Sequence, residues 1–202
     1  MEERARLNPQ SASQSTVLKA WVSINTPLTE LEEHVVRMFS EHLDMNSFHW
    51  REYDLSMHFI GPIFSLVNFT VRGKFNLFAQ ESFEAIINDD ITLSGRADEV
   101  IATGFRAAKL PLFAVNEYKK ETDPDGDPNG QCLAAMLVAQ KLNNNDLPIY
   151  GCVIIGRVWR FVVLEGSNYT FSKNFDGAVF EDACQIVRIL KELKAYCIIR
   201  TA

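Results

Sequence analysis

A carboxylate and an ammonium group stand two residues apart where an apolar segment ends, at Glu117 and Lys119 in LPLFAVNEYKK (110–120). Successive side chains of a strand point to opposite faces, so Glu117 and Lys119 share one face. A second carboxylate, Asp98, interrupts the preceding β-like segment ITLSGRADEVIAT (91–103), and aspartate is a poor strand residue. If the two segments pair as antiparallel strands, we expect Asp98 and Glu117 to lie close together.

These residue types suit the hydrolysis of a phosphodiester bond. Two carboxylates from adjacent strands repel each other unless a cation lies between them. Their hard oxygen donors select Mg²⁺ or Mn²⁺, so Asp98 and Glu117 are the predicted metal ligands. Water bound to such a cation ionises more easily than bulk water and becomes a nucleophile. Lys119 reaches the same cavity, where it holds a water molecule or stabilises charge on the phosphate.

The elements on either side must place these side chains. On the strand 110–120, alternation puts Phe113 and Val115 on the face of Glu117 and Lys119, whose end of the strand is where α/β sheets commonly carry their sites. Residues 91–103 form the other strand of the expected hairpin. A solvated, Pro- and Gly-rich loop and a helix over 130–144 follow, since GQCLAAMLVAQKLNN is built of good helix formers.

The rest of the chain completes a layered α/β pattern. We expect strands on both sides of Gly156, over 148–166, with a further strand over 168–175. The spacing of apolar residues predicts helices over 29–43 and 177–199. Aromatic and β-branched residues over 48–75 favour strands or a hairpin, and residues 76–89 are expected to form a short helix.

The predicted fold class is therefore α/β, a mixed central β-sheet flanked by helices, with an N-terminal α+β extension. We expect three parts: a disordered tail (1–15), the extension (16–76) and a nuclease-like core (77–202). The extension is also the expected surface of a homodimer, because its apolar residues exceed what a small peripheral hairpin buries.

The order of these motifs resembles the PD-(D/E)XK nuclease superfamily, which has the restriction-endonuclease-like fold. The resemblance covers roughly residues 80–175 and rests on Asp98, on Glu117-Tyr118-Lys119 after an apolar strand, and on the helix that starts at Gly130-Gln131. It implies that Asp98 and Glu117 bind metal and that Lys119 assists the nucleophile. It also implies that Gln131 lines the site and that Glu84 joins it from the preceding helix.

Two positions depart from the family pattern. Ala97 stands where the family has proline before the aspartate. Ala135 stands where the RecB-like branch has tyrosine, four residues after the glutamine. The E-x-K spacing is common by chance, so the resemblance depends on the hairpin before it and the helix after it.

Composition limits the remaining classes. The 202 residues are 47% hydrophobic and carry a net charge of −6, which excludes a strongly basic nucleic-acid binder. Residues 1–90 hold 7 Lys/Arg and 13 Asp/Glu, so the acidity belongs to the N-terminal half. The four cysteines have no C-x-x-C spacing and are expected to be reduced thiols in a cytoplasmic protein. No apolar run approaches the roughly 18 residues of a membrane span, and no signal peptide is expected.

Two readings of the function remain open at this point. The first is a Mg²⁺- or Mn²⁺-dependent nuclease, with DNA as the expected substrate. The second is a non-catalytic binding or assembly module that keeps the fold, in a restriction or defence system. The alternative for the residues themselves is a solvated strand end, with Glu99 exposed on the opposite face. Near Gly156, Arg157, Trp159 and Arg160 either contact phosphate and bases or form a strand surface with one buried aromatic.

Overall fold

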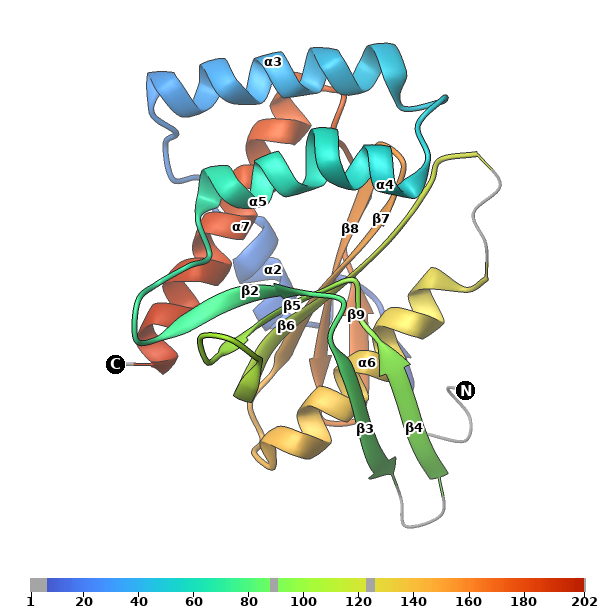
Figure 1. Ribbon diagram of the computed structural model, residues 1–202. Coiled ribbons are helices and arrows are strands. Elements are labelled where there is room, and N and C mark those ends of the chain that lie inside the picture. The colour runs from blue at the N-terminus through green and yellow to red at the C-terminus, as the bar shows by residue number, and fades with distance from the viewer. Residues whose placement is uncertain (1–6, 88–90, 123–125, 202) are drawn as a thin grey trace.

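The computed structural model describes residues 7–87, 91–122 and 126–201. One large mixed sheet runs through the molecule in the order β1-β9-β8-β7-β6-β5-β2, with β10 paired to β8 (Figure 1). Its strands are β1 (Asn8–Gln10), β2 (Phe75–Ala79), β5 (Glu99–Thr103), β6 (Lys109–Lys119), β7 (Ile149–Ile155), β8 (Val158–Glu165), β9 (Asn168–Phe171) and β10 (Phe175–Asp176). A separate hairpin joins β3 (Ser82–Ile87) to β4 (Ile91–Arg96). The expected mixed sheet with flanking helices is confirmed.

The centre of the sheet is a hairpin followed by a crossover. β5 and β6 pair antiparallel, and helix α6 (Pro128–Asn143) then carries the chain to β7, which runs parallel to β6. A parallel neighbour requires such a crossover, whereas β7, β8 and β9 follow one another as antiparallel hairpins. The Asp127 side chain caps α6 by accepting a hydrogen bond from the Gly130 amide, and Pro128 occupies the first turn, where its missing N–H costs nothing.

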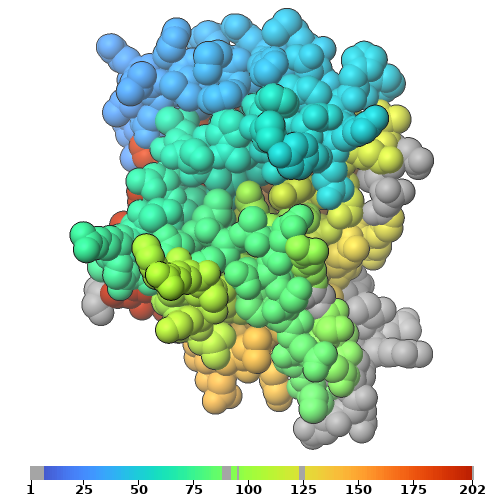
Figure 2. All heavy atoms as spheres, viewed as in Figure 1, coloured from blue at the N-terminus to red at the C-terminus, as the bar shows by residue number. Residues whose placement is uncertain are grey.

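Helices cover both faces of the sheet. α6 packs with the β3–β4 hairpin on one face (Figure 1). The other face shares a core with the remaining helices, which are α2 (Thr16–Val22), α3 (Glu30–Asn46), α4 (Glu52–Leu55), the π-helical turn η1 (Ser56–Ile60), α5 (Gly61–Val67) and α7 (Phe180–Arg200). In Figure 2, α3 forms a continuous blue-to-cyan layer over the top of the molecule, above the teal and green surface of α4, α5 and β2. Within the described residues, no helix is long and apolar enough to cross a membrane.

The two helices predicted from apolar spacing are confirmed as α3 and α7. The Thr29 hydroxyl accepts a hydrogen bond from the Glu32 amide at 3.2 Å, and the Glu32 carboxylate accepts from the Thr29 amide at 2.7 Å. This reciprocal capping box satisfies two backbone donors that the first turn leaves without partners. It fixes the start of α3 one residue after Thr29.

The expectation of strands over 48–75 is wrong, because most of this segment is helical. Phe59, Ile60, Ile63, Phe64 and Val67 are all buried, and they recur at the spacing of one helix face. Burial of that face against the sheet outweighs the β-propensity of the individual residues. Pro62 is tolerated because it lies in the first turn of α5.

The expected helix over 76–89 is also wrong. The chain forms β2, turns at Gln80 with a φ of +56°, and continues as β3. Phe83, Ala85 and Ile87 alternate toward α6, so the period of this segment is two rather than 3.6. Residues 88–90 lie outside the described part of the chain.

Two observations bear on the expected division into a tail, an extension and a core. Asn8–Gln10, within the expected disordered tail, pair with β9 as a parallel strand. The boundary at residue 77 falls inside β2, and Trp21, Phe59 and Phe64 share one core cluster with Trp159 and Phe161 of the sheet. Residues 16–76 are therefore packed as part of the same body as the sheet.

Candidate functional site

An irregularity in the β5–β6 pairing decides which face each side chain of β6 occupies. The register shifts between Ile101 and Ala102, and Phe113 falls at the bulge, opposite no residue of β5. Phe113 therefore packs in the core shared with α7, whereas Val115 packs against α6. The expected sharing of a face by Phe113 and Glu117 is wrong for this reason. Beyond the bulge, alternation holds, and Glu117 and Lys119 follow Val115 on the α6 face.

Glu117 is a buried carboxylate whose charge is balanced by its neighbour. Its Oε1 accepts a hydrogen bond from Lys119 Nζ at 2.7 Å. Burial raises the pKa of Glu117, and the negative charge of Asp98 raises it further, while the hydrogen bond from Lys119 opposes both effects. The predicted pairing of an acid and a base on this face is thus present, at the last residues of β6.

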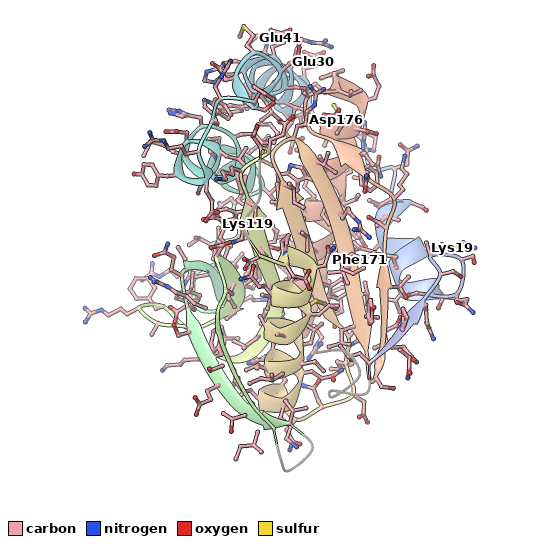
Figure 3. All side chains as sticks on the ribbon, turned by 90° about the vertical axis from the view of Figure 1, so that its right-hand side faces the viewer. Lys19, Glu30, Glu41, Lys119, Phe171 and Asp176 are labelled. Atoms are coloured by element: carbon pink, nitrogen blue, oxygen red, sulfur yellow. The ribbon has the colours of Figure 1, made fainter. Side chains whose placement is uncertain are left out.

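Lys119 holds a protonated ammonium group among carboxylates. Burial lowers its pKa, but the hydrogen bond to Glu117 and the charges of Glu117, Glu52 and Asp98 outweigh burial, so the pKa lies above its ordinary value. The side chain of Lys119 is 13% exposed, so most of it lies inside the protein. Figure 3 shows Lys119 beside the start of α6, below the helices that precede the sheet.

Asp98 fixes the end of β6 from the side. It lies in the break between β4 and β5, and its Oδ2 accepts a hydrogen bond from the Tyr118 amide at 2.9 Å. Burial raises the pKa of Asp98, and the Tyr118 hydrogen bond and the charge of Lys119 oppose that rise. The carboxylate thus contacts the backbone midway between Glu117 and Lys119. The structure brings together three of the five residues that the sequence suggests.

Glu52 belongs to the same cluster, although no local sequence pattern indicates it. Its Oε2 lies 3.8 Å from Lys119 Nζ, and its charge raises the pKa of Glu117. It starts α4, far before the E-x-K motif in the chain, where the sequence favoured a strand. The resemblance implies a glutamate from the preceding helix, and the helix expected over 76–89 points to Glu84 instead of Glu52.

Glu84 and Gln131 do not join this cluster through any contact among the described residues. Glu84 is exposed on β3, opposite Ser94, on the side of the hairpin that faces away from α6. Gln131 is exposed in the first turn of α6, one residue before Cys132, whose pKa is raised by burial and by the charge of Glu117. Gln131 is therefore near the site in the fold, and its side chain points to solvent.

A second pair of polar side chains lies behind the site, on the opposite face of the hairpin. Glu99 and Asn116 are directly opposite each other in the β5–β6 register, and both are buried. Burial raises the pKa of Glu99 to about 7, and the neighbouring Asn116 side chain opposes that rise. Glu99 Oε2 and Asn116 Nδ2 have no hydrogen-bond partner among the described residues. Glu99 is thus on the opposite face, as the alternative interpretation held, but it is buried rather than solvated.

The donor set suits a small hard cation. Among the described residues, no three or more His, Cys, Asp or Glu side chains gather as a metal site. Mg²⁺ does not need such a cage, since it commonly takes one or two protein carboxylates and completes its shell with water and substrate phosphate. Burial raises the pKa of both carboxylates, and the charge of Asp98 raises that of Glu117 further, which is the chemistry that a divalent cation stabilises. Asp98 and Glu117 therefore fit Mg²⁺ or Mn²⁺.

The other residues noted in the sequence divide into structural and exposed groups. Trp159 is fully buried, and Arg157 holds the β8–β10 region by donating to Asp176 at 2.7 Å and to Asp44 at 3.0 Å. Arg160 is half-buried on the α6 face. The four cysteines are buried free thiols.

No protein-family model matches this chain, and a search of curated proteins gives no match.

Proposed function

We propose that the protein hydrolyses phosphodiester bonds of nucleic acid with Mg²⁺ or Mn²⁺ at Asp98, Glu117 and Lys119, and that DNA is its substrate. The observation that supports this most is the hydrogen bond between Lys119 Nζ and the buried Glu117 carboxylate, beside the point where Asp98 accepts from the Tyr118 amide. One ammonium and two carboxylates thereby meet at the end of a single strand. The resemblance to PD-(D/E)XK nucleases assigns these residues the same roles.

In this proposal each side chain has a separate task. Asp98 and Glu117 hold the cation, which when bound stabilises phosphate charge and supplies an activated water. Lys119 donates from its ammonium group to the attacking water or to a phosphate oxygen, since its raised pKa keeps it protonated. Glu52, half-exposed at 43%, attracts Lys119 across 3.8 Å and helps to orient it.

A non-catalytic nucleic-acid-binding module is the second candidate, and one observation favours it. The Glu117–Lys119 ion pair already neutralises both charges without any further group. A pair of this kind also serves as a structural end to a buried strand. The two candidates differ in what a divalent cation does to the protein.

Cleavage and metal binding should be measured on the same preparations. Supercoiled, linear duplex and single-stranded DNA, and RNA, are incubated with Mg²⁺, Mn²⁺ or EDTA. Calorimetry with Mn²⁺ compares wild type with Glu117→Gln, which keeps the shape but removes one ligand charge. The control is Lys141→Ala, at an exposed position near the other end of α6.

If the protein is a nuclease, we expect metal-dependent cleavage by wild type. We also expect Mn²⁺ to bind wild type and not Glu117→Gln. Binding of DNA without cleavage of any substrate supports the non-catalytic module. Equal Mn²⁺ affinity in wild type and Glu117→Gln removes Glu117 from the site and contradicts the proposal.

A further inference from the structure

One arginine lies in line with Glu117 across the sheet. Glu117 is opposite Val153 in the β6–β7 register, and Val153 is opposite Arg160 in the β7–β8 register. Residues opposite each other in neighbouring strands point to the same face, so Arg160 shares the α6 face with Glu117. Neighbouring strands are about 4.8 Å apart, which puts Arg160 roughly 10 Å from Glu117 at the level of the sheet.

The neighbours of Arg160 support this placement. Trp159 and Phe161, on either side of it in β8, point into the core on the opposite face of the sheet. Phe171 of β9 packs with the core on the α6 face, and the guanidinium carbon of Arg160 lies 4.4 Å from the centre of its ring. α6 covers β6 and β7 but hardly reaches β8. Figure 3 shows Lys119 and Phe171 on the side facing the viewer, with the start of α6 between them.

Arg160 is held in place without its charge being neutralised. Phe171 supports the guanidinium plane by a cation–π contact. Among residues 7–87, 91–122 and 126–201, no acidic side chain forms an ion pair with Arg160, whereas Arg157 nearby is paired with both Asp176 and Asp44. An arginine stacked on an aromatic ring keeps its N–H donors available at the ring's edge. Two such donors match the oxygens of one phosphate.

We propose that Arg160, supported by Phe171, binds a backbone phosphate of the nucleic acid within a few nucleotides of the one that is cut. This inference rests on the proposed function for its choice of ligand. Successive phosphates of one DNA strand advance by about 3.4 Å along the helix axis and also wind round it, so a group roughly 10 Å from Glu117 reaches a phosphate within about three nucleotides of the cut. A protein with a net charge of −6 repels DNA overall, so local contacts of this kind must supply the attraction.

The contact is tested by binding measured separately from cleavage. Fluorescence anisotropy follows a labelled 20-base-pair duplex in EDTA at several salt concentrations, for wild type, Arg160→Gln and Arg160→Lys. The matched control is Arg37→Gln, since Arg37 also stacks on a phenylalanine, Phe180, but lies on α3. Melting temperatures establish that each variant is folded.

We expect Arg160→Gln to weaken duplex binding about 10-fold at low salt and to reduce the slope of log K against log salt by about 0.9, the value for one phosphate contact. Arg160→Lys should keep the slope, because it keeps the charge, and Arg37→Gln should match wild type. In cleavage assays Arg160→Gln should raise KM with little change in kcat, as expected when binding is lost equally from substrate and transition state.

A second measurement locates the phosphate. Duplexes carry a single neutral methylphosphonate at each position in turn. At one position the methylphosphonate should weaken binding by wild type and leave binding by Arg160→Gln unchanged. The inference is overturned if folded Arg160→Gln has the same slope of log K against log salt as wild type. It is also overturned if Arg37→Gln reduces that slope as much as Arg160→Gln does. If wild type binds DNA with this Arg160-dependent slope but cleaves no substrate, the proposed nuclease activity is contradicted and the phosphate contact at Arg160 is supported.

Discussion

Substitution of Lys119 distinguishes an effect on cleavage from an effect on metal binding. A protonated lysine cannot ligate a cation, so Lys119→Ala should keep the metal site while it loses a donor to water or phosphate. We expect cleavage to fall on the order of 10²-fold, the scale of one electrostatic or acid–base element. Mn²⁺ affinity should stay the same or rise slightly, because the positive charge beside the two carboxylates is removed. Single-turnover cleavage and calorimetry measure the two effects. Cleavage equal to that of Lys141→Ala would place the active site elsewhere.

Glu99 gives the protein a pH dependence that can be assigned to one residue. Below about pH 4 the carboxyl group is protonated in both the folded and the unfolded chain, so it contributes no pH dependence there. As the pH rises to about 7, the unfolded chain releases this proton while the folded chain keeps it, because the folded pKa is raised to about 7. The group therefore destabilises the fold increasingly across that window, and by a constant amount above it.

Replacement by glutamine removes this titration. We expect Glu99→Gln to be more stable than wild type at pH 8 by about 2 kcal/mol more than at pH 5, from the pKa shift between the two states. Urea unfolding at both pH values measures the difference, with Glu84→Gln as the exposed control. A difference that does not change with pH would show that Glu99 is ionised in the folded protein.

At the scale of elements, the β7–β8 turn is joined to the end of β6. The Gly156 amide donates to the Lys119 carbonyl at 2.9 Å, and Gly156 has a φ of +55°. A Cβ atom at this position would overlap Glu121 Cβ, 2.2 Å away. Gly166, in the β8–β9 turn, has a similar φ of +60° but open space around it. A comparison of substitutions at the two glycines therefore distinguishes the cost of backbone strain from the cost of steric overlap.

We expect Gly166→Ala to cost about 1 kcal/mol of stability, from the left-handed backbone alone. Gly156→Ala should cost about 3 kcal/mol, because the chain after Lys119 must also shift. It should reduce cleavage as well, since Lys119 moves with that segment. Urea unfolding compares the two variants. Equal costs would mean that Glu121 adjusts freely and that the turn does not support the site.

The sequence predicts the elements whose pattern is local. Alternation along 110–120 identifies β6 and puts Glu117 and Lys119 on one face, and good helix formers identify α6. The bulge at Phe113 is not visible in the same pattern, because it arises from the pairing with β5 rather than from the residues of β6. Alternation counted backward from Glu117 therefore assigns Phe113 to the wrong face.

Glu52 was not predictable for a related reason. Its segment carries aromatic and β-branched residues that favour strands, and it becomes helical because Phe59, Ile63 and Phe64 are buried against the sheet. Only the tertiary fold brings α4 beside Lys119. Arg160 was open to both interpretations, because the choice depends on which face of β8 is covered by α6.

At the scale of the whole molecule, the chain should unfold as one unit. Trp21 Nε1 donates to the Ile189 carbonyl at 2.9 Å, and the residues of α2 to α5 share one core with the sheet. We expect one calorimetric transition with equal van't Hoff and calorimetric enthalpies, because the main cores on the two faces are built on the same sheet. Deletion of residues 1–75 should give an insoluble or unfolded protein. A truncated chain with a cooperative transition of its own would show that residues 76–202 form a separate domain.

The homodimer expected through the N-terminal segment stays a prediction. The apolar residues that suggested it, such as Phe59 and Phe64, are buried within the chain. Leu31, Met38 and Met45 remain exposed, one every seven residues along α3. Light scattering at high micromolar concentration measures the oligomeric state, and a monomer there contradicts self-association.

The contact between the two ends of the described chain also bears on how the protein is made. Asn8–Gln10 pair with β9, and α2 packs against α7, whose 21 residues come last along the chain. During synthesis at about 5–20 residues per second, the early helices leave the ribosome well before the strands and the helix that cover them. Their aromatic side chains stay exposed to water for several seconds at least. Folding of the nascent chain must therefore wait for α7, and chaperones that hold apolar segments are the cellular factors on which its yield should depend.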